Sequence, residues 1–253
     1  MESGMLRDTM KNKIYFDDKI NFNKESTGEL KAKIANQDNA TFMRLKVAFR
    51  FVETSLIILH ECYARGDNLN ELKPLLNEIL SVRQQQKMFG DLLPLKEQKR
   101  RVGWEEIRQD YMRNTFLKWL AFAYCLDMGE VYYKQVLDLI ANQGQDALLD
   151  EIAVQLGDTE RPISDKLLYK TRFNKLYKVI QAAPDKRPKL MMAYLDAWYK
   201  LEGSPENHLM DNNSYRGYWS WEAALVTKLY GIEDSLFIDH EYYPKDLVHW
   251  SEQ

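Results

Sequence analysis

The sequence predicts an all-α protein, a multi-helix bundle of long antiparallel helices arranged as two helical subdomains that pack together. Two observations carry this prediction. Apolar residues recur at spacings of three and four along most of the chain, which is the period of an α-helix. Alternating β-branched runs closed by Asn-Gly or Asp-Gly turns are missing from the sequence, which argues against a substantial sheet.

The composition is that of a globular protein. The chain has 253 residues, of which 45% are hydrophobic, and it contains only 11 glycines and 7 prolines. This length allows one large or two small domains with a full apolar core. The formal net charge of -3 provides no overall positive field for nucleic acid or anionic lipid, so we expect no direct nucleic-acid binding.

The clearest helical stripe runs from Leu45 to Leu59, with apolar residues on one face over four turns. Gly66 is placed to end this helix in the left-handed conformation. Asn68, followed three residues later by Glu71, resembles the start of a second helix. The two helices are therefore expected to form a hairpin, although Pro74 leaves the start of the second helix undecided.

A basic run follows this hairpin and precedes a predicted helix that opens at Trp104. Its cations are Lys96, Lys99, Arg100 and Arg101. A solvated loop with neighbouring acids explains the run better than a phosphate site, because no aromatic residues alternate with the cations.

The second half of the chain is also expected to be helical. Asp127-Met128-Gly129 interrupts the apolar period, which predicts an N-terminal domain of residues 1–127 and a C-terminal domain of residues 128–253. Helices are expected within residues 116–124, 131–140, 147–156, 173–180 and 190–201.

The sequence also bears on the compartment. Cys62 and Cys125 lie in apolar helical runs, which favours reduced thiols in the core over a disulfide framework. The first residues lack the apolar block of a signal peptide, and no run approaches the length of a membrane span. We expect a cytoplasmic protein without a membrane partner.

Catalytic motifs are sparse. His60-Glu61 and His240-Glu241 both lack the second histidine of a zinc protease motif, and no Gly-rich phosphate loop or nucleophile elbow occurs. Asp239, His240, Glu241 and His249 are metal-binding residue types without a recognisable spacing. We therefore predict a protein that is not an enzyme, with no catalytic residues, no metal and no cofactor; a metal-dependent hydrolase is a distant alternative.

Negative charge is concentrated at the C-terminal end. Residues 204–253 contain 9 acids and 3 bases, whereas the remaining 203 residues contain 29 acids and 32 bases. This asymmetry is expected of a segment that meets a cationic partner, although a solvated acidic surface without a partner would look the same.

The same segment is rich in aromatic residues. Residues 218–230 read as a helix that is apolar over a wide arc, so Trp219 and Trp221 are interpreted as scaffold. Tyr242-Tyr243-Pro244 is expected to be extended, because a proline restricts the residue before it.

At these residues the sequence resembles a known family. The runs Tyr215-Arg216-Gly217-Tyr218-Trp219-Ser220-Trp221-Glu222-Ala223-Ala224 and Tyr242-Tyr243-Pro244-Lys245-Asp246-Leu247 resemble the C-terminal domain of PoNi immunity proteins. The run from Tyr63 to Asp67, with Leu69 and Pro74, is similar to the hairpin of that family's N-terminal domain. The family consists of bacterial cytoplasmic antitoxins paired with PoNe-type DNase toxins of polymorphic toxin systems and secretion-system effectors.

The resemblance implies a non-catalytic helical protein that binds a cognate DNase toxin and blocks it, as required in competition between bacteria. A DNase presents cations to the DNA backbone, so an acidic surface can compete with DNA for that site. The expected toxin contacts are the acids after Gly231, taken to be exposed: Glu233, Asp234, Asp239, Glu241 and Asp246. The expected structural motif is Tyr215, Gly217, Tyr218, Trp219, Trp221, Glu222, Tyr242, Tyr243 and Pro244. A helical scaffold that holds a basic peptide or a regulatory partner is the alternative.

Overall fold

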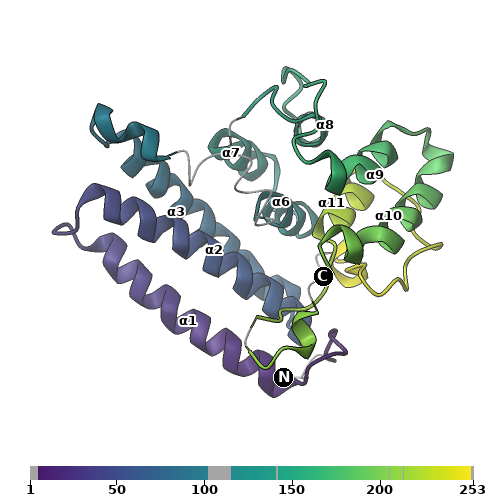
Figure 1. The fold of residues 1–253 in the computed structure, drawn as a ribbon, viewed down its shortest axis with the longest axis horizontal. Coiled ribbons are helices and arrows are strands. Elements are labelled where there is room, and N and C mark those ends of the chain that lie inside the picture. The colour runs from purple at the N-terminus through teal and green to yellow at the C-terminus, as the bar shows by residue number, and fades with distance from the viewer. Residues whose placement is uncertain (1–4, 102–114, 141, 205, 213, 252–253) are drawn as a thin grey trace. The chain divides into compact units, whose positions relative to one another are not determined.

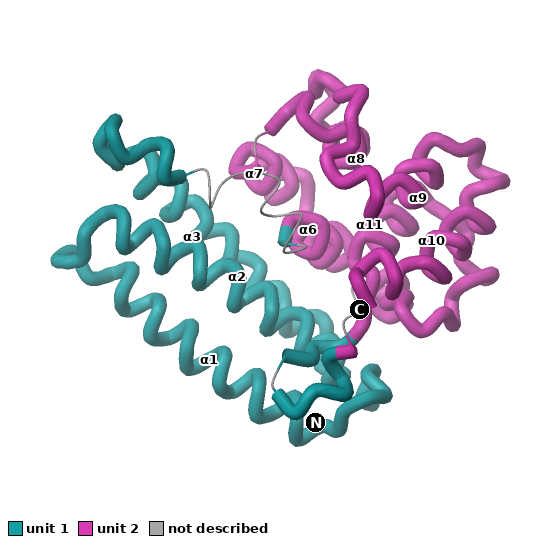
Figure 2. Tube along the Cα trace, in the orientation of Figure 1, with its two compact units in different colours: residues 1–115, 207–217 teal, residues 116–206, 218–253 magenta. Residues whose placement is uncertain are grey.

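The computed structural model describes residues 5–101, 115–140, 142–204, 206–212 and 214–251. Within these ranges the regular structure is helical and no strand is present, so the all-α prediction is confirmed. The chain divides into two compact units, which Figure 2 colours separately. Unit 1 contains residues 1–115 and 207–217, and unit 2 contains residues 116–206 and 218–253. The family-domain boundary after residue 127 stays a prediction.

Three long helices build unit 1, and α2 lies between α1 and α3 (Figure 1). Their bounds are Lys13–Ala35 for α1, Thr41–Arg65 for α2 and Lys73–Asp91 for α3. Three 3-10 turns accompany them: η1 at Leu69–Leu72, η2 at Leu95–Arg101 and η4 at Asn207–Leu209.

The predicted helical hairpin is confirmed. Gly66 ends α2 in the left-handed conformation, with a φ of 89°, and its N–H donates to the carbonyl of Tyr63. The Asn68 side chain caps η1 by accepting the N–H of Asn70. The α-helix starts only after this turn, so that Pro74 lies in the first turn of α3, where its missing N–H costs nothing.

Helix α1 was not predicted by the apolar period. Four apolar side chains of α1 are buried: Phe16, Ile20, Leu30 and Ile34. They share one face, but the middle of that face is polar. The Lys19 ammonium lies 3.3 Å from the buried Glu61 carboxylate, which also accepts a hydrogen bond of 2.8 Å from Asn23. A buried ion pair between two helices thus replaces the apolar contacts that a periodicity search detects.

Unit 2 contains the remaining helices, and each helix expected between residues 116 and 201 is present. The bounds are Thr115–Cys125 for α6, Glu130–Ile140 for α7, Ala147–Gln155 for α8, Lys170–Gln181 for α9, Arg187–Leu201 for α10, Trp221–Leu229 for α11 and Lys245–Val248 for α12. The turn η3 spans Pro184–Lys186. Trp119 and Trp221 are fully buried in this unit.

The expected helix over residues 218–230 starts later than predicted. Helix α11 begins at Trp221, so Trp219 precedes it and is half-buried. The expected helix that opens at Trp104 lies outside the described residues. In the basic run, Arg101 pairs with Asp91 at 2.8 Å, which fits the interpretation of a solvated, internally neutralised loop.

Both cysteines are free and buried, as predicted. Among the helices that the structure describes, none combines the length and the hydropathy needed to cross a membrane.

Candidate interaction surface

A cluster of half-exposed aromatic rings lies on unit 2. Tyr199 and Tyr242 are stacked at a centroid distance of 5.6 Å and an interplanar angle of 14°. Tyr218 contacts Tyr199 edge-on at 5.1 Å, and the His240 ring lies 5.4 Å from Tyr242. A cluster of large aromatic rings on a protein surface is typical of an interaction site, because tyrosine is enriched in the centres of interfaces.

Three separate segments supply these rings. In α10, Trp198 is buried, whereas the next residue, Tyr199, is half-exposed. The N–H of Ser220, at the start of α11, donates to the carbonyl of Tyr242 at 2.8 Å, which fixes the loop before α12 against the segment that carries Tyr218. The Tyr242 ring also packs on Trp198 at 5.1 Å. The rings are therefore held by buried neighbours rather than by a free loop.

Carboxylates border the rings. Asp196 in α10 lies 3.6 Å from the His240 imidazole, and the exposed Glu241 precedes Tyr242 in the chain. Burial and this carboxylate raise the pKa of Tyr242. Asp239 is exposed and pairs with Lys245 at 2.6 Å. We call the set Tyr199, Tyr218, Tyr242, His240, Asp196, Asp239 and Glu241 the acidic aromatic surface.

The predicted acids do not all lie on the exterior. Glu233, Asp239, Glu241 and Asp246 are exposed. The expectation that Asp234 is exposed was wrong, since it is buried and accepts a 2.7 Å hydrogen bond from the Tyr243 hydroxyl. His249 also contacts the Asp234 carboxylate, at 2.8 Å. Asp234 thus ties the start of the loop to its end, and a role for the five acids as toxin contacts stays a prediction.

The buried part of the motif centres on Glu222. Its side chain has no exposed surface and accepts hydrogen bonds from the Tyr194 hydroxyl at 2.6 Å and the Trp198 indole at 2.8 Å. Nearby, Glu202 pairs with Arg172. Burial and the charge of Glu222 raise the pKa of Glu202 to about 7. A buried carboxylate with two donors orients α10 against α11, which places Tyr199 beside Tyr242.

The motif also joins the two units along the chain. Tyr215 is buried in unit 1, and its hydroxyl donates to Asp8. Gly217 has a φ of 104°, a conformation that favours glycine, just before the chain enters unit 2 at Tyr218. In unit 2, Tyr243 and Pro244 are buried. The motif therefore combines scaffold positions with the surface positions Tyr218 and Tyr242.

The alternative of a metal site has no support in the described part of the chain. There, no three His, Cys, Asp or Glu side chains lie close enough together to hold a metal ion. His249 contacts Asp234, whereas His240 faces Asp196 and Tyr242.

Two surface residues, Tyr199 and Asp196, escaped the sequence reasoning. The apolar period of α10 identifies Tyr194 and Trp198 as core, and it does not mark Tyr199 and Asp196, which lie off that period. A tyrosine directly after a buried tryptophan was the available signal.

Comparison with protein families gives one match. Residues 144–247 match the family model described as PoNe immunity proteins (PoNi), C-terminal. The PoNi resemblance is confirmed. The PoNi match includes α8 to α11, the Glu222 network and all residues of the acidic aromatic surface.

A solved structure shares the fold. Protein PA2201 from Pseudomonas aeruginosa superposes with a TM-score of 0.76 at 18% sequence identity, over 97% of this chain and 90% of PA2201. At this identity the likeness concerns the fold alone. No curated protein matches the chain.

Proposed function

We propose that the protein is an immunity protein that binds and neutralises a cognate PoNe-type DNase toxin in the cytoplasm. The observation that supports this most strongly is the PoNi match over residues 144–247, which contains the acidic aromatic surface. The PoNi family is not known for catalysis, in keeping with a protein that acts by binding.

The chemistry of the surface suits a DNase. Such a toxin must hold a polyanion, so its DNA site carries cations. Asp196, Asp239 and Glu241 offer carboxylates to those cations, and the tyrosine rings offer a desolvated centre and cation–π faces. In this proposal the acidic aromatic surface covers the DNA site of the toxin and excludes its substrate.

DNA cleavage by the purified toxin tests the proposal. We expect cleavage of duplex DNA by the cognate PoNe-type toxin to fall to background as the protein is added. The protein alone is expected neither to cleave DNA nor to bind it at physiological salt. An unrelated helical protein of similar net charge is the control, because it should leave cleavage unchanged. Undiminished cleavage at a large excess of the immunity protein would contradict the proposal.

A further inference from the structure

A pocket of unit 2 lies apart from the acidic aromatic surface, at the C-terminal end of α11. It has a volume of 600 Å³ and is lined by residues from the end of α6, the start of α7, the end of α8 and the C-terminal segment. Ser220, which fixes Tyr242, precedes the other end of α11, about 13 Å away along the helix. A standard interface covers about 800 Å² on each partner, so a separation of this size lies within a single interface.

Aromatic rings form part of the wall of this pocket. Tyr124, Tyr133 and Trp250 line it, and the rings of Tyr124 and Tyr133 lie 5.7 Å apart. The ammonium of Lys228 lies over the Trp250 ring, 5.8 Å from its centroid. Tyr124 and Trp250 are only half-buried. The pocket therefore leaves ring surface uncovered that an occupant can contact.

The charges that line the pocket do not cancel. Asp127 and Glu130 are exposed and have no ion-pair partner within the described residues. The lining also contains one cation, Lys228, whose ammonium already donates hydrogen bonds to the carbonyls of Cys125 at 2.8 Å and Trp250 at 3.0 Å. Two carboxylates against one internally bonded ammonium leave a net negative charge beside the rings.

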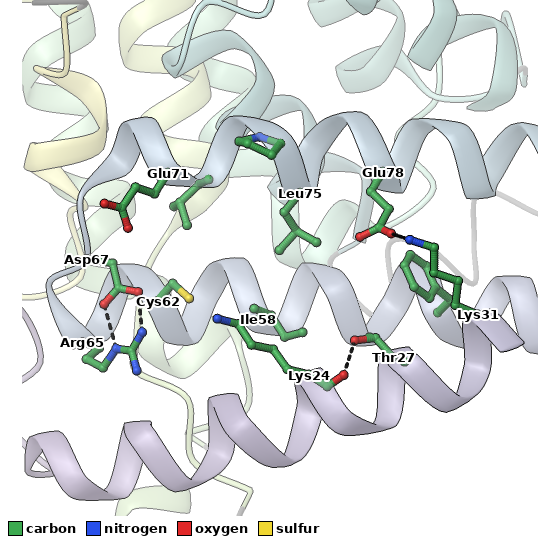
Figure 3. A pocket seen from close by; sticks show the side chains of 14 residues that line it. Lys24, Thr27, Lys31, Ile58, Cys62, Arg65, Asp67, Glu71, Leu75 and Glu78 are labelled. Carbon is green, nitrogen blue, oxygen red and sulfur yellow. Dashed lines mark hydrogen bonds and ion pairs between the residues drawn. The ribbon is translucent and has the colours of Figure 1, made fainter.

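The groove of unit 1 that Figure 3 shows lacks this combination. There Lys31 pairs with Glu78, and Arg65 pairs with Asp67. Its floor is already covered, since Ile58 is only 2% exposed. The pocket at the end of α11 is thus the better candidate for a binding site.

We propose that this pocket binds an arginine side chain of the toxin, and this inference rests on the function proposed above. Asp127 and Glu130 accept hydrogen bonds from the guanidinium, while the rings of Tyr124 and Trp250 cover its plane. A guanidinium suits both features, because it is planar, stacks on aromatic rings and donates in a fork to carboxylates. A lysine ammonium is more strongly hydrated and has no flat face to stack. A DNase that holds DNA through its cations has such side chains to offer.

Toxin affinity tests the two carboxylates. The dissociation constant for the PoNe-type toxin is measured for the wild type and for the Asp127→Asn, Glu130→Gln double variant. We expect the double variant to bind at least about tenfold more weakly, because the guanidinium loses its charged acceptors. Asparagine tolerates the left-handed φ of 49° at Asp127, so the turn is preserved.

A matched control separates the pocket from net charge. Asp138 and Glu160 are exposed in unit 2, do not line the pocket and have no ion-pair partner within the described residues. The Asp138→Asn, Glu160→Gln double variant therefore removes the same charge and should bind the toxin like the wild type. Circular dichroism and melting curves establish that both double variants are folded.

A second measurement needs no toxin. The NMR signal of the Trp250 indole N–H, assigned with Trp250→Phe, is followed as N-acetyl-arginine amide is added. We expect a shift that saturates in the wild type and is lost in the Asp127→Asn, Glu130→Gln variant. The amide of N-acetyl-citrulline has nearly the same shape without the charge, so it should leave the signal in place.

The two measurements also distinguish this inference from the proposed function. Wild-type toxin affinity in the folded Asp127→Asn, Glu130→Gln variant would overturn the pocket proposal and leave the proposed function intact. A Trp250 signal that arginine amide does not move, or that citrulline amide moves equally, would overturn the pocket proposal in the same way. A wild-type protein that does not bind the toxin at all would overturn both.

Discussion

Trp221→Ala is expected to lower the free energy of unfolding by about 3 to 5 kcal/mol. The Trp221 side chain is fully buried, and its ring lies 4.7 Å from that of Phe122 in α6. Truncation removes the transfer free energy of a large ring and leaves a cavity between α6 and α11 that the surrounding helices can only partly close.

Urea unfolding followed by circular dichroism measures this loss. Trp219→Ala is the matched control, because Trp219 lies outside α11 and is only half-buried; it should cost clearly less. Equal losses in the two variants, or an unchanged midpoint for Trp221→Ala, would contradict the scaffold role of Trp221. If Trp221→Ala binds the toxin less well, we expect the loss only under conditions in which the variant is unfolded.

Tyr242→Ala is expected to weaken toxin binding by about 30-fold or more, the effect of a central tyrosine in an interface. Tyr242 contacts Tyr199, Tyr218 and His240, so its removal takes away the ring that holds the acidic aromatic surface together. Calorimetric titration of the toxin gives the dissociation constant.

Tyr177→Ala is the control for this variant, since Tyr177 is a half-exposed tyrosine of unit 2 outside the surface. Its affinity should stay near that of the wild type. Because Tyr242 also packs on Trp198, melting curves must establish that Tyr242→Ala is folded at the temperature of the titration. Unchanged affinity in the folded variant would remove Tyr242 from the interface.

Sequence patterns predicted the elements whose stability comes from apolar contacts along one face. Helix α2 is such a case, with Gly66 as its end signal. Helix α1 is of similar length, 23 residues against 25, but it buries Lys19 against Glu61, whose carboxylate also accepts a hydrogen bond from Asn23. A pairing between residues about forty positions apart leaves no local trace. The sequence could therefore indicate a hairpin but not the helix packed on its other side.

The candidate surface was predictable in part for a similar reason. Charge counting located Asp239 and Glu241 correctly on the exterior, because the buried positions of the loop before α12 are mostly taken by apolar and aromatic residues. Charge counting could not show that Asp234, unlike these two acids, is buried. Its burial depends on Tyr243 and His249, which lie 9 and 15 residues further along the chain. Asp196 belongs to the surface only because helix α10 places it beside His240.

The most direct test of a toxin interface on the acidic aromatic surface is the association rate measured at several salt concentrations. The Asp239→Lys, Glu241→Lys double variant reverses two exposed carboxylates that no buried contact requires. Opposite charges steer encounter, so the variant should associate with the toxin about tenfold more slowly at low salt, and its rate should depend less on salt than that of the wild type. Wild-type rates and an unchanged salt dependence in the folded double variant would contradict this account and place the toxin elsewhere on the protein.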